Sequence, residues 1–253
     1  MAPTSVPTST PTSAATAIPM STGGDSIEDG PIEFDANGEK LLGYLSRPTL
    51  PGPHPDIVVV HENRGLLPHF QDITRRYARE GYVALTIDAL SREGGADAFA
   101  DMLAALRQVP TDKVVADGNA AVSFLQDQSY VRRDRIGATG FCFGGSIVWL
   151  IAVGSPELRA AVPFYGSAPP LESVADLQVP VLGIYAGEDS RINAEVASLA
   201  TALRSEDKEY KFVTYPGANH AFFNDTSSRY HPQAAEGAWM EALDWFEDHL
   251  MDS

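Results

Sequence analysis

The only cysteine of the chain, Cys142, lies in the segment TGFCFGG, between Gly140 and Gly144. The spacing Gly-x-Cys-x-Gly is that of a nucleophile elbow, a sharp turn from a strand into a helix that holds a reactive side chain in a strained backbone conformation. The start of the following helix favours a thiolate at this position. The alternative is a structural cysteine, since free cysteine is among the most buried residue types. The motif alone therefore leaves the role of Cys142 open.

Two residues later in the chain favour the catalytic interpretation. Asp189 follows the apolar run PVLGIYAGE, and His220 follows YKFVTYPGAN, so both are expected in loops that come directly after strands. The order nucleophile, acid, histidine is that of an α/β-hydrolase triad. In such a triad His220 takes the proton of the thiol, and Asp189 sets the tautomer of the imidazole and stabilises its charged form. We interpret these residues as a Cys-His-Asp triad.

Other polar residues compete for these roles. Glu188 adjoins Asp189 and is the alternative acid, although the GEDSR pattern favours Asp189. His61 and His69 come before the nucleophile, which is the wrong order, and we interpret His61 as a hydrogen-bonded structural histidine at a strand end. Asp88, which ends the run VALTID, is interpreted as a structural turn residue.

The elements that must position the triad alternate between strands and helices. Strands are predicted in apolar runs over residues 40–48, 56–63, 81–90, 134–142, 158–166, 180–189 and 210–220. Helices are predicted from Phe70 to Tyr77, over residues 97–106 and 111–126, over 145–153 after the cysteine, and near the end, where Trp239, Leu243, Phe246 and Leu250 share a face. This alternation predicts an α/β fold with a mostly parallel central sheet and helices on both faces. In such sheets, the binding and catalytic residues lie at the carboxyl ends of the strands.

The composition restricts the class of partner. The chain has 253 residues, with 18 Lys and Arg against 34 Asp and Glu, and a formal net charge of −16. A surface this acidic repels phosphate backbones and anionic lipids, so we expect a small-molecule substrate and neither a nucleic acid nor a membrane as a partner. One cysteine excludes an intramolecular disulfide and a multi-cysteine zinc site. We expect a monomer or a weak dimer.

The first 24 residues contain almost only Ala, Pro, Thr, Ser and Gly and carry no charged side chain. Such a segment cannot bury enough apolar surface to fold. We therefore predict a disordered tail over residues 1–29 and one domain over residues 30–253. No Lys or Arg precedes Lys40, so a signal peptide is poorly supported and a cytoplasmic location is expected, with export through an unrecognised leader as the alternative.

Five motifs together carry a family resemblance: HENRGL, TIDALSREGG, GFCFGG, YAGEDSRI and YPGANHAFFND. As a set they resemble the dienelactone hydrolases, over roughly residues 33 to 250. The resemblance implies the α/β-hydrolase fold, hydrolysis of lactones or carboxylic esters through a thioacyl-enzyme, and the same triad, without a metal or an organic cofactor. It also implies that Glu62 contacts the resting thiol and helps to form the thiolate, and that the backbone N–H groups of Phe143 and Asn63 form the oxyanion hole.

The resemblance is incomplete where the substrate is bound. Well-described members of the family hold a substrate carboxylate with two arginines, and Arg92 matches the first of them. Asn224 occupies the position of the second. Arg64 and Arg229 are the candidates to replace it. With fewer cations in the site, a different lactone or a simple carboxylic ester is as plausible a substrate as dienelactone itself.

Two other functions compete with hydrolysis. A non-catalytic or redox-sensing protein on a hydrolase fold would use Cys142 as an oxidisable thiol, but it would not need Asp189 and His220. A member of the glutamine amidotransferase superfamily would also place a cysteine on an elbow near a glutamate. The later Asp and His loops and the chain length fit that fold poorly.

Overall fold

An eight-stranded sheet forms the centre of the computed structural model, which describes residues 26–36 and 38–251. The strands lie in the order β1-β2-β4-β3-β5-β6-β7-β8. Their bounds are β1 Ile27–Ala36, β2 Glu39–Pro48, β3 His54–Val60, β4 Val83–Ile87, β5 Val131–Phe141, β6 Ala160–Phe164, β7 Val181–Ala186 and β8 Tyr210–Tyr215. The pairs β1–β2 and β2–β4 are antiparallel, and every other neighbouring pair is parallel. The predicted mostly parallel sheet is confirmed.

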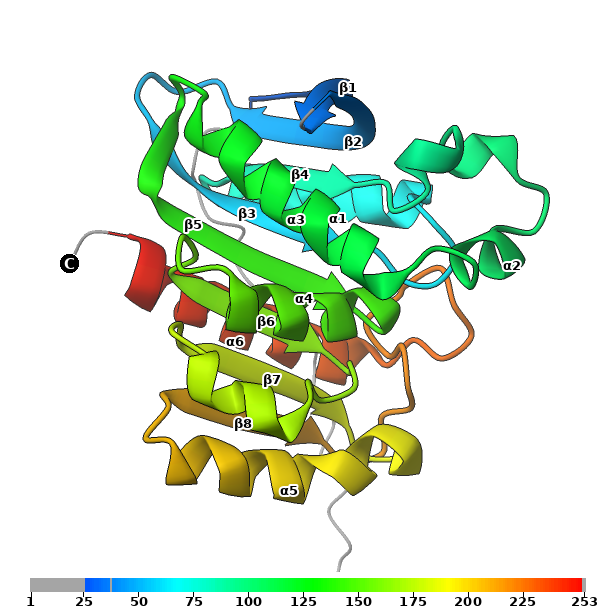
Figure 1. Ribbon diagram of the computed structural model, residues 1–253, viewed down its shortest axis with the longest axis vertical. Helices are drawn as coiled ribbons and strands as arrows, with labels where there is room; N and C mark the ends of the chain where they lie inside the picture. Colours follow the sequence, from blue (N-terminus) through cyan, green and yellow to red (C-terminus); the bar gives the residue numbers. More distant parts are fainter. Residues whose placement is uncertain (1–25, 37, 252–253) are drawn as a thin grey trace, which may run out of the picture.

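Helices cover both faces of this sheet, as predicted. Their bounds are α1 Pro68–Arg79, α2 Met102–Leu106, α3 Thr111–Gln126, α4 Phe143–Gly154, α5 Ser190–Ser205 and α6 Pro232–Leu250. Short 3-10 helices lie at Ser91–Glu93, Ala96–Ala98 and Leu171–Asp176. Figure 1 shows α3, α4 and α5 over one face and α6 behind the other. Within the described ranges, none of these helices is long and apolar enough to cross a bilayer.

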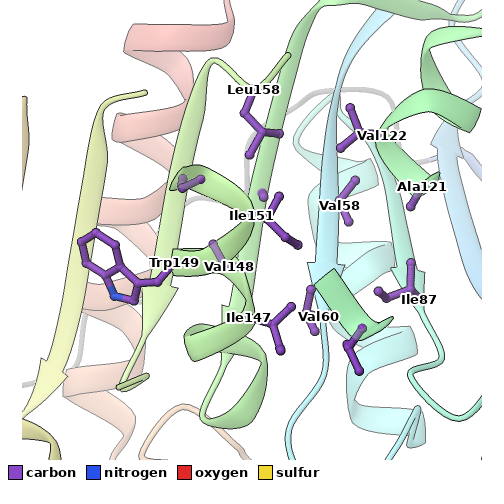
Figure 2. Close-up of a cluster of buried hydrophobic side chains, with 14 of the residues drawn as sticks. Val58, Val60, Ile87, Ala121, Val122, Ile147, Val148, Trp149, Ile151 and Leu158 are labelled. Carbon is purple, nitrogen blue, oxygen red and sulfur yellow. The ribbon is translucent and has the colours of Figure 1, made fainter. Parts of the chain in front are cut away.

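Strand β3 is apolar at consecutive positions because it is buried on both faces. Val58 and Val60 belong to the core cluster that contains the buried side chains of α3 and α4, and Figure 2 shows them beside that layer. Ile57 and Val59 belong to the second cluster, with the buried side chains of α1 and α6. Successive side chains of a strand point to opposite faces, so a central strand covered by two helical layers requires an uninterrupted apolar run.

Three differences from the sequence prediction concern helix and strand bounds. The helix predicted over residues 97–106 is confined to α2, because the side chain of Asp101 accepts a hydrogen bond from the Ala104 N–H and caps the helix there. Helix α5 was not predicted. Strand β1 was not predicted either: it begins at Ile27 and pairs with β2, so residues 27–29 belong to the sheet rather than to the predicted tail. The rest of that tail, up to residue 25, lies outside the described residues.

The parallel strands all end at the same edge of the sheet. The carboxyl ends of β3, β5, β6, β7 and β8 lie side by side there, because these five strands follow one another in the sheet. The residues that follow them are Glu62, Cys142, Tyr165, Asp189 and His220. Side chains from five distant parts of the chain therefore meet at this edge.

Candidate active site

Cys142 occupies a strained turn between β5 and α4. Its φ is 57° and its ψ is −111°, a conformation that few residues other than glycine adopt. The turn requires glycines at its flanks: a Cβ on Gly140 would collide with the backbone of Gly144, and a Cβ on Gly144 would collide with the carbonyl oxygen of Val60. Phe143 is the first residue of α4, so its N–H has no partner within the helix. The geometry is that of the predicted nucleophile elbow.

His220 and Asp189 form a hydrogen-bonded pair. Asp189 comes three residues after β7 and caps α5, with Oδ1 accepting from the Ile192 N–H at 3.3 Å. Its Oδ2 bonds to Nδ1 of His220. Because an ionised carboxylate only accepts, Nδ1 carries the proton and Nε2 remains an acceptor. The structure brings these two residues together as predicted, whereas Glu188 is exposed.

A cleft of about 310 Å³ opens over the cysteine. The side chains and backbone that line it come from Asn63, Leu103, Leu106, Arg107, Val109, Thr111, Cys142, Phe143, Ser146, Tyr165, Ser167, Arg191 and Ile192. Asn63 and Phe143, the two predicted oxyanion-hole residues, are among them. Neither of their N–H groups donates to a main-chain acceptor among the described residues.

Glu62 is buried behind the cleft, with 9% of its surface exposed, and is held by neutral donors. The hydroxyl of Tyr165 donates to Oε1 at 3.2 Å, and Nδ2 of Asn224 donates to Oε2 at 3.0 Å. The orientation of the Asn224 amide is determined, because its oxygen accepts from both the N–H and the hydroxyl of Thr226. Asn224 is therefore a partner of Glu62 and does not line the cleft.

His61 and Asp88 have the structural roles predicted for them. Nε2 of His61 accepts from the Ala89 N–H at 3.1 Å, so Nδ1 donates to the carbonyl of Glu62 at 2.6 Å. Burial lowers the pKa of His61, which keeps the ring neutral. The carboxylate of Asp88 accepts from two backbone N–H groups of the following loop. These contacts fix the loop that carries Glu62.

The environment of Cys142 favours the neutral thiol. Burial, followed by the negative charge of Glu62, raises its pKa to about 11, although a hydrogen bond from the Phe143 N–H and the positive charge of Arg191 act in the opposite direction. Among the described residues the thiol has no hydrogen bond to His220 or to Glu62. The resting site therefore holds a neutral thiol, and the charge of Glu62 acts on it without a hydrogen bond between the two side chains.

The predicted arginine clamp is not present in this structure. Nε and Nη2 of Arg92 both donate to Asp117, at 3.0 and 2.6 Å, and Nη1 lies 3.6 Å from Glu39. Asp117 is buried on α3, and an unpaired buried carboxylate is costly, which explains why Arg92 binds it instead of facing the cleft. Arg64 and Arg229 are exposed and do not line the cleft either.

The sequence prediction missed three residues of the site. Tyr165 directly follows β6, so its strand-end position was a usable signal, as it was for the triad. Arg191 lies two residues after Asp189, inside a motif that was noted for its acid alone. Arg107 directly follows the short helix α2, and nothing in its local sequence distinguishes it from a surface arginine.

Comparison with known proteins shows which family the chain resembles. The model of the dienelactone hydrolase family matches residues 41–250. A "Putative carboxymethylenebutenolidase" of Escherichia coli K12 is 36% identical over 247 residues, which cover 91% of this chain and 90% of the relative. A "Probable 2-oxo-3-(5-oxofuran-2-ylidene)propanoate lactonase" of a Bradyrhizobium species is 33% identical and covers 87% of this chain and 94% of its own.

A solved structure extends the likeness to the fold. The crystal structure of a "Putative Dienelactone Hydrolase" from Klebsiella pneumoniae superposes with a TM-score of 0.82 and 33% identity. The match covers 89% of this chain and all of the other. The fold is therefore the α/β-hydrolase fold, as the resemblance implied. Together with the matches over most of the sequence, it shows that the chain is a hydrolase that belongs to the dienelactone hydrolase family.

Proposed function

We propose that this protein hydrolyses small lactones or carboxylic esters, with Cys142 as the nucleophile, His220 as the general base and acid, and Asp189 as the partner of the histidine. The observation that carries this proposal is the meeting of an elbow thiol with a paired His–Asp couple at one edge of the sheet, beside a cleft. The names of the Bradyrhizobium and E. coli relatives, a lactonase and a carboxymethylenebutenolidase, support a lactone as substrate.

The proposed reaction has two steps. The Cys142 sulfur attacks the carbonyl carbon, and the oxyanion accepts hydrogen bonds from the N–H groups of Phe143 and Asn63, each worth about 3 kcal/mol at the transition state. The proton of the thiol passes to Nε2 of His220 during this attack. Collapse breaks the acyl carbon–oxygen bond, and the leaving oxygen takes that proton from Nε2, which leaves a thioester. Nε2 of His220 then deprotonates a water that attacks the thioester and releases the acid and the thiol. No metal or organic cofactor takes part.

The resting thiol requires activation before this reaction. With a pKa of about 11, roughly one molecule in ten thousand carries a thiolate at pH 7. We propose that Glu62, fixed beside the thiol by Tyr165 and Asn224, helps to remove its proton when substrate arrives. The raised pKa does not suit the alternative of a redox sensor, since oxidation-sensitive cysteines are accessible thiols of low pKa.

The test of the proposed reaction is to trap its covalent intermediate. The wild-type protein is mixed with p-nitrophenyl acetate, p-nitrophenyl butyrate and an unsaturated five-membered lactone, and p-nitrophenol release or ring opening is followed. We expect turnover above the buffer rate and, after an acid quench, an acyl group on the Cys142 peptide by mass spectrometry, which hydroxylamine removes. Turnover with the acyl group on another residue of the cleft, such as Ser146, would contradict the assignment.

Glu62→Gln separates the charge of Glu62 from its part in proton transfer. The amide retains an acceptor for Tyr165 but removes the negative charge that raises the pKa of Cys142. We therefore expect alkylation of the free enzyme by iodoacetamide at pH 8 to become several-fold faster, while kcat/KM falls by about 10²-fold because the base is lost. In the wild type, alkylation should rise about tenfold per pH unit between pH 7 and 10.

Glu188→Gln is the matched control, since this exposed acid lies near the same site. The alkylation rate and kcat/KM of this variant should both stay near those of the wild type. Faster alkylation of Glu62→Gln with unchanged kcat/KM would mean that Glu62 supplies only charge and takes no part in proton transfer.

A further inference from the structure

Two arginines line the cleft beside the nucleophile, and neither was expected there. Arg107 follows helix α2, and Arg191 is the second residue of helix α5. Both are exposed, and both line the same cleft as Cys142. The positive charge of Arg191 acts on the thiol, which shows that it lies within electrostatic range of the reacting atom.

Neither arginine has an ion-pair partner among the residues that the structure describes. Elsewhere in this strongly acidic chain, arginines are commonly paired with a carboxylate, as Arg47, Arg76 and Arg92 are. The position of Arg191 is also unfavourable by itself, because the start of a helix carries a partial positive charge that repels a cation. Contacts within the protein do not explain why these two cations lie at the cleft.

The rest of the cleft suggests what kind of molecule approaches them. Its aliphatic lining consists of Leu103, Leu106, Val109 and Ile192, which come from the same two parts of the chain as the arginines, and two aromatic residues, Phe143 and Tyr165, line it as well. Glu62, in contrast, is buried beside the thiol and would repel an anion that bound deeply. A substrate with a short apolar body and a terminal anion therefore fits best with its anion at the exposed rim.

We propose that Arg107 and Arg191 form an anion subsite that holds a carboxylate of the substrate at the rim of the cleft, while its ester or lactone carbonyl lies at Cys142. The inference rests on the proposed hydrolase function. Two arginines can bind one carboxylate through several charge-assisted hydrogen bonds. With this subsite the enzyme selects acidic esters or lactones, although the arginine pair expected from the sequence does not line the cleft.

A matched pair of substrates tests the subsite. Mono-p-nitrophenyl glutarate ends in a carboxylate, and p-nitrophenyl pentanoate has the same chain length with a methyl group in its place. The measured quantity is the ratio of kcat/KM for the two esters, so a change in thiol reactivity caused by a variant cancels. We expect Arg107→Gln and Arg191→Gln each to lower this ratio roughly five- to tenfold, mainly through KM, and the double variant to lower it further. The effect should weaken as salt is raised.

Arg229→Gln is the control, because that exposed arginine lies outside the cleft. Its ratio of kcat/KM for the two esters should equal that of the wild type. If this ratio fell in Arg229→Gln and not in the cleft variants, the proposal would be overturned. If the wild type hydrolyses the pentanoate ester but the ratio is unchanged in Arg107→Gln and Arg191→Gln, the subsite is wrong and the hydrolase function stands.

A binding measurement tests the subsite even if neither ester is hydrolysed. Such a lack of hydrolysis would count against the proposed function and not against the subsite. Glutarate should slow the alkylation of Cys142 by iodoacetamide at pH 9 in the wild type. This protection should be lost in the double arginine variant and kept in Arg229→Gln. Equal protection in all three proteins would overturn the subsite.

Discussion

Replacing Cys142 by alanine is expected to abolish ester and lactone hydrolysis, with kcat/KM falling by about 10⁴- to 10⁶-fold. The reason is that the thioester cannot form without the sulfur, so only the N–H groups of the cleft remain to stabilise the oxyanion. The measurement is p-nitrophenol release from short-chain esters and ring opening of an unsaturated lactone, on the wild type and Cys142→Ala side by side.

Alanine is a suitable replacement because the backbone strain stays the same. Cysteine and alanine both carry a Cβ, so the φ of 57° at the elbow costs the same in both proteins. Thermal unfolding of the variant should therefore stay close to that of the wild type. Undiminished turnover by a folded Cys142→Ala protein would refute the thiol mechanism, and with it the whole assignment of the triad.

Asp189→Asn is expected to lower kcat on the order of 10³-fold while the protein stays folded. Asparagine is as good a helix cap as aspartate, so the hydrogen bond to the Ile192 N–H and the start of α5 are kept. The amide NH₂ group, however, donates toward Nδ1 of His220 and forces the proton onto Nε2. The ring can then no longer accept the proton of the thiol.

Glu188→Gln serves as the matched control for this variant, because it neutralises the neighbouring acid, which the sequence left as an alternative. It is exposed, and it should change kcat by less than twofold. If Glu188→Gln instead caused the large loss and Asp189→Asn did not, the acid of the triad would be Glu188. The pH profile adds a second check, because Asp189→Asn should lower the rate at every pH from 6 to 9.

The central part of the fold was predictable from local patterns. The bounds of α3 were predicted at both ends, and each parallel strand was recognised from its apolar run. A central strand covered by helices on both faces must be apolar throughout, so the buried elements are the most visible ones in a sequence. Strand β1 was missed for the same reason, because its side chains are mostly exposed or half-buried at an edge of the sheet.

The charged residues of the site were predicted less well. Arg92 was assigned to the substrate but pairs with Asp117, which lies 25 residues away along the chain. Asn224 was considered for the same task but donates to Glu62, at a separation of 162 residues. These partners come within hydrogen-bond distance only once α3 and the loop after β8 are packed. No local pattern in the sequence shows which carboxylate a long side chain will reach.

The sequence by itself determined the order of the strands along the chain and the residues Cys142, Asp189 and His220 that follow three of them. The carboxyl ends of parallel strands meet at one edge, so a position just after a strand is enough to predict a place in the site. Only the tertiary structure decided which cations line the cleft, since Arg107 and Arg191 are there while Arg92 is not. The physical reason is that a charge interacts strongly only over a few ångströms and binds the nearest buried partner, and those distances exist only in the folded chain.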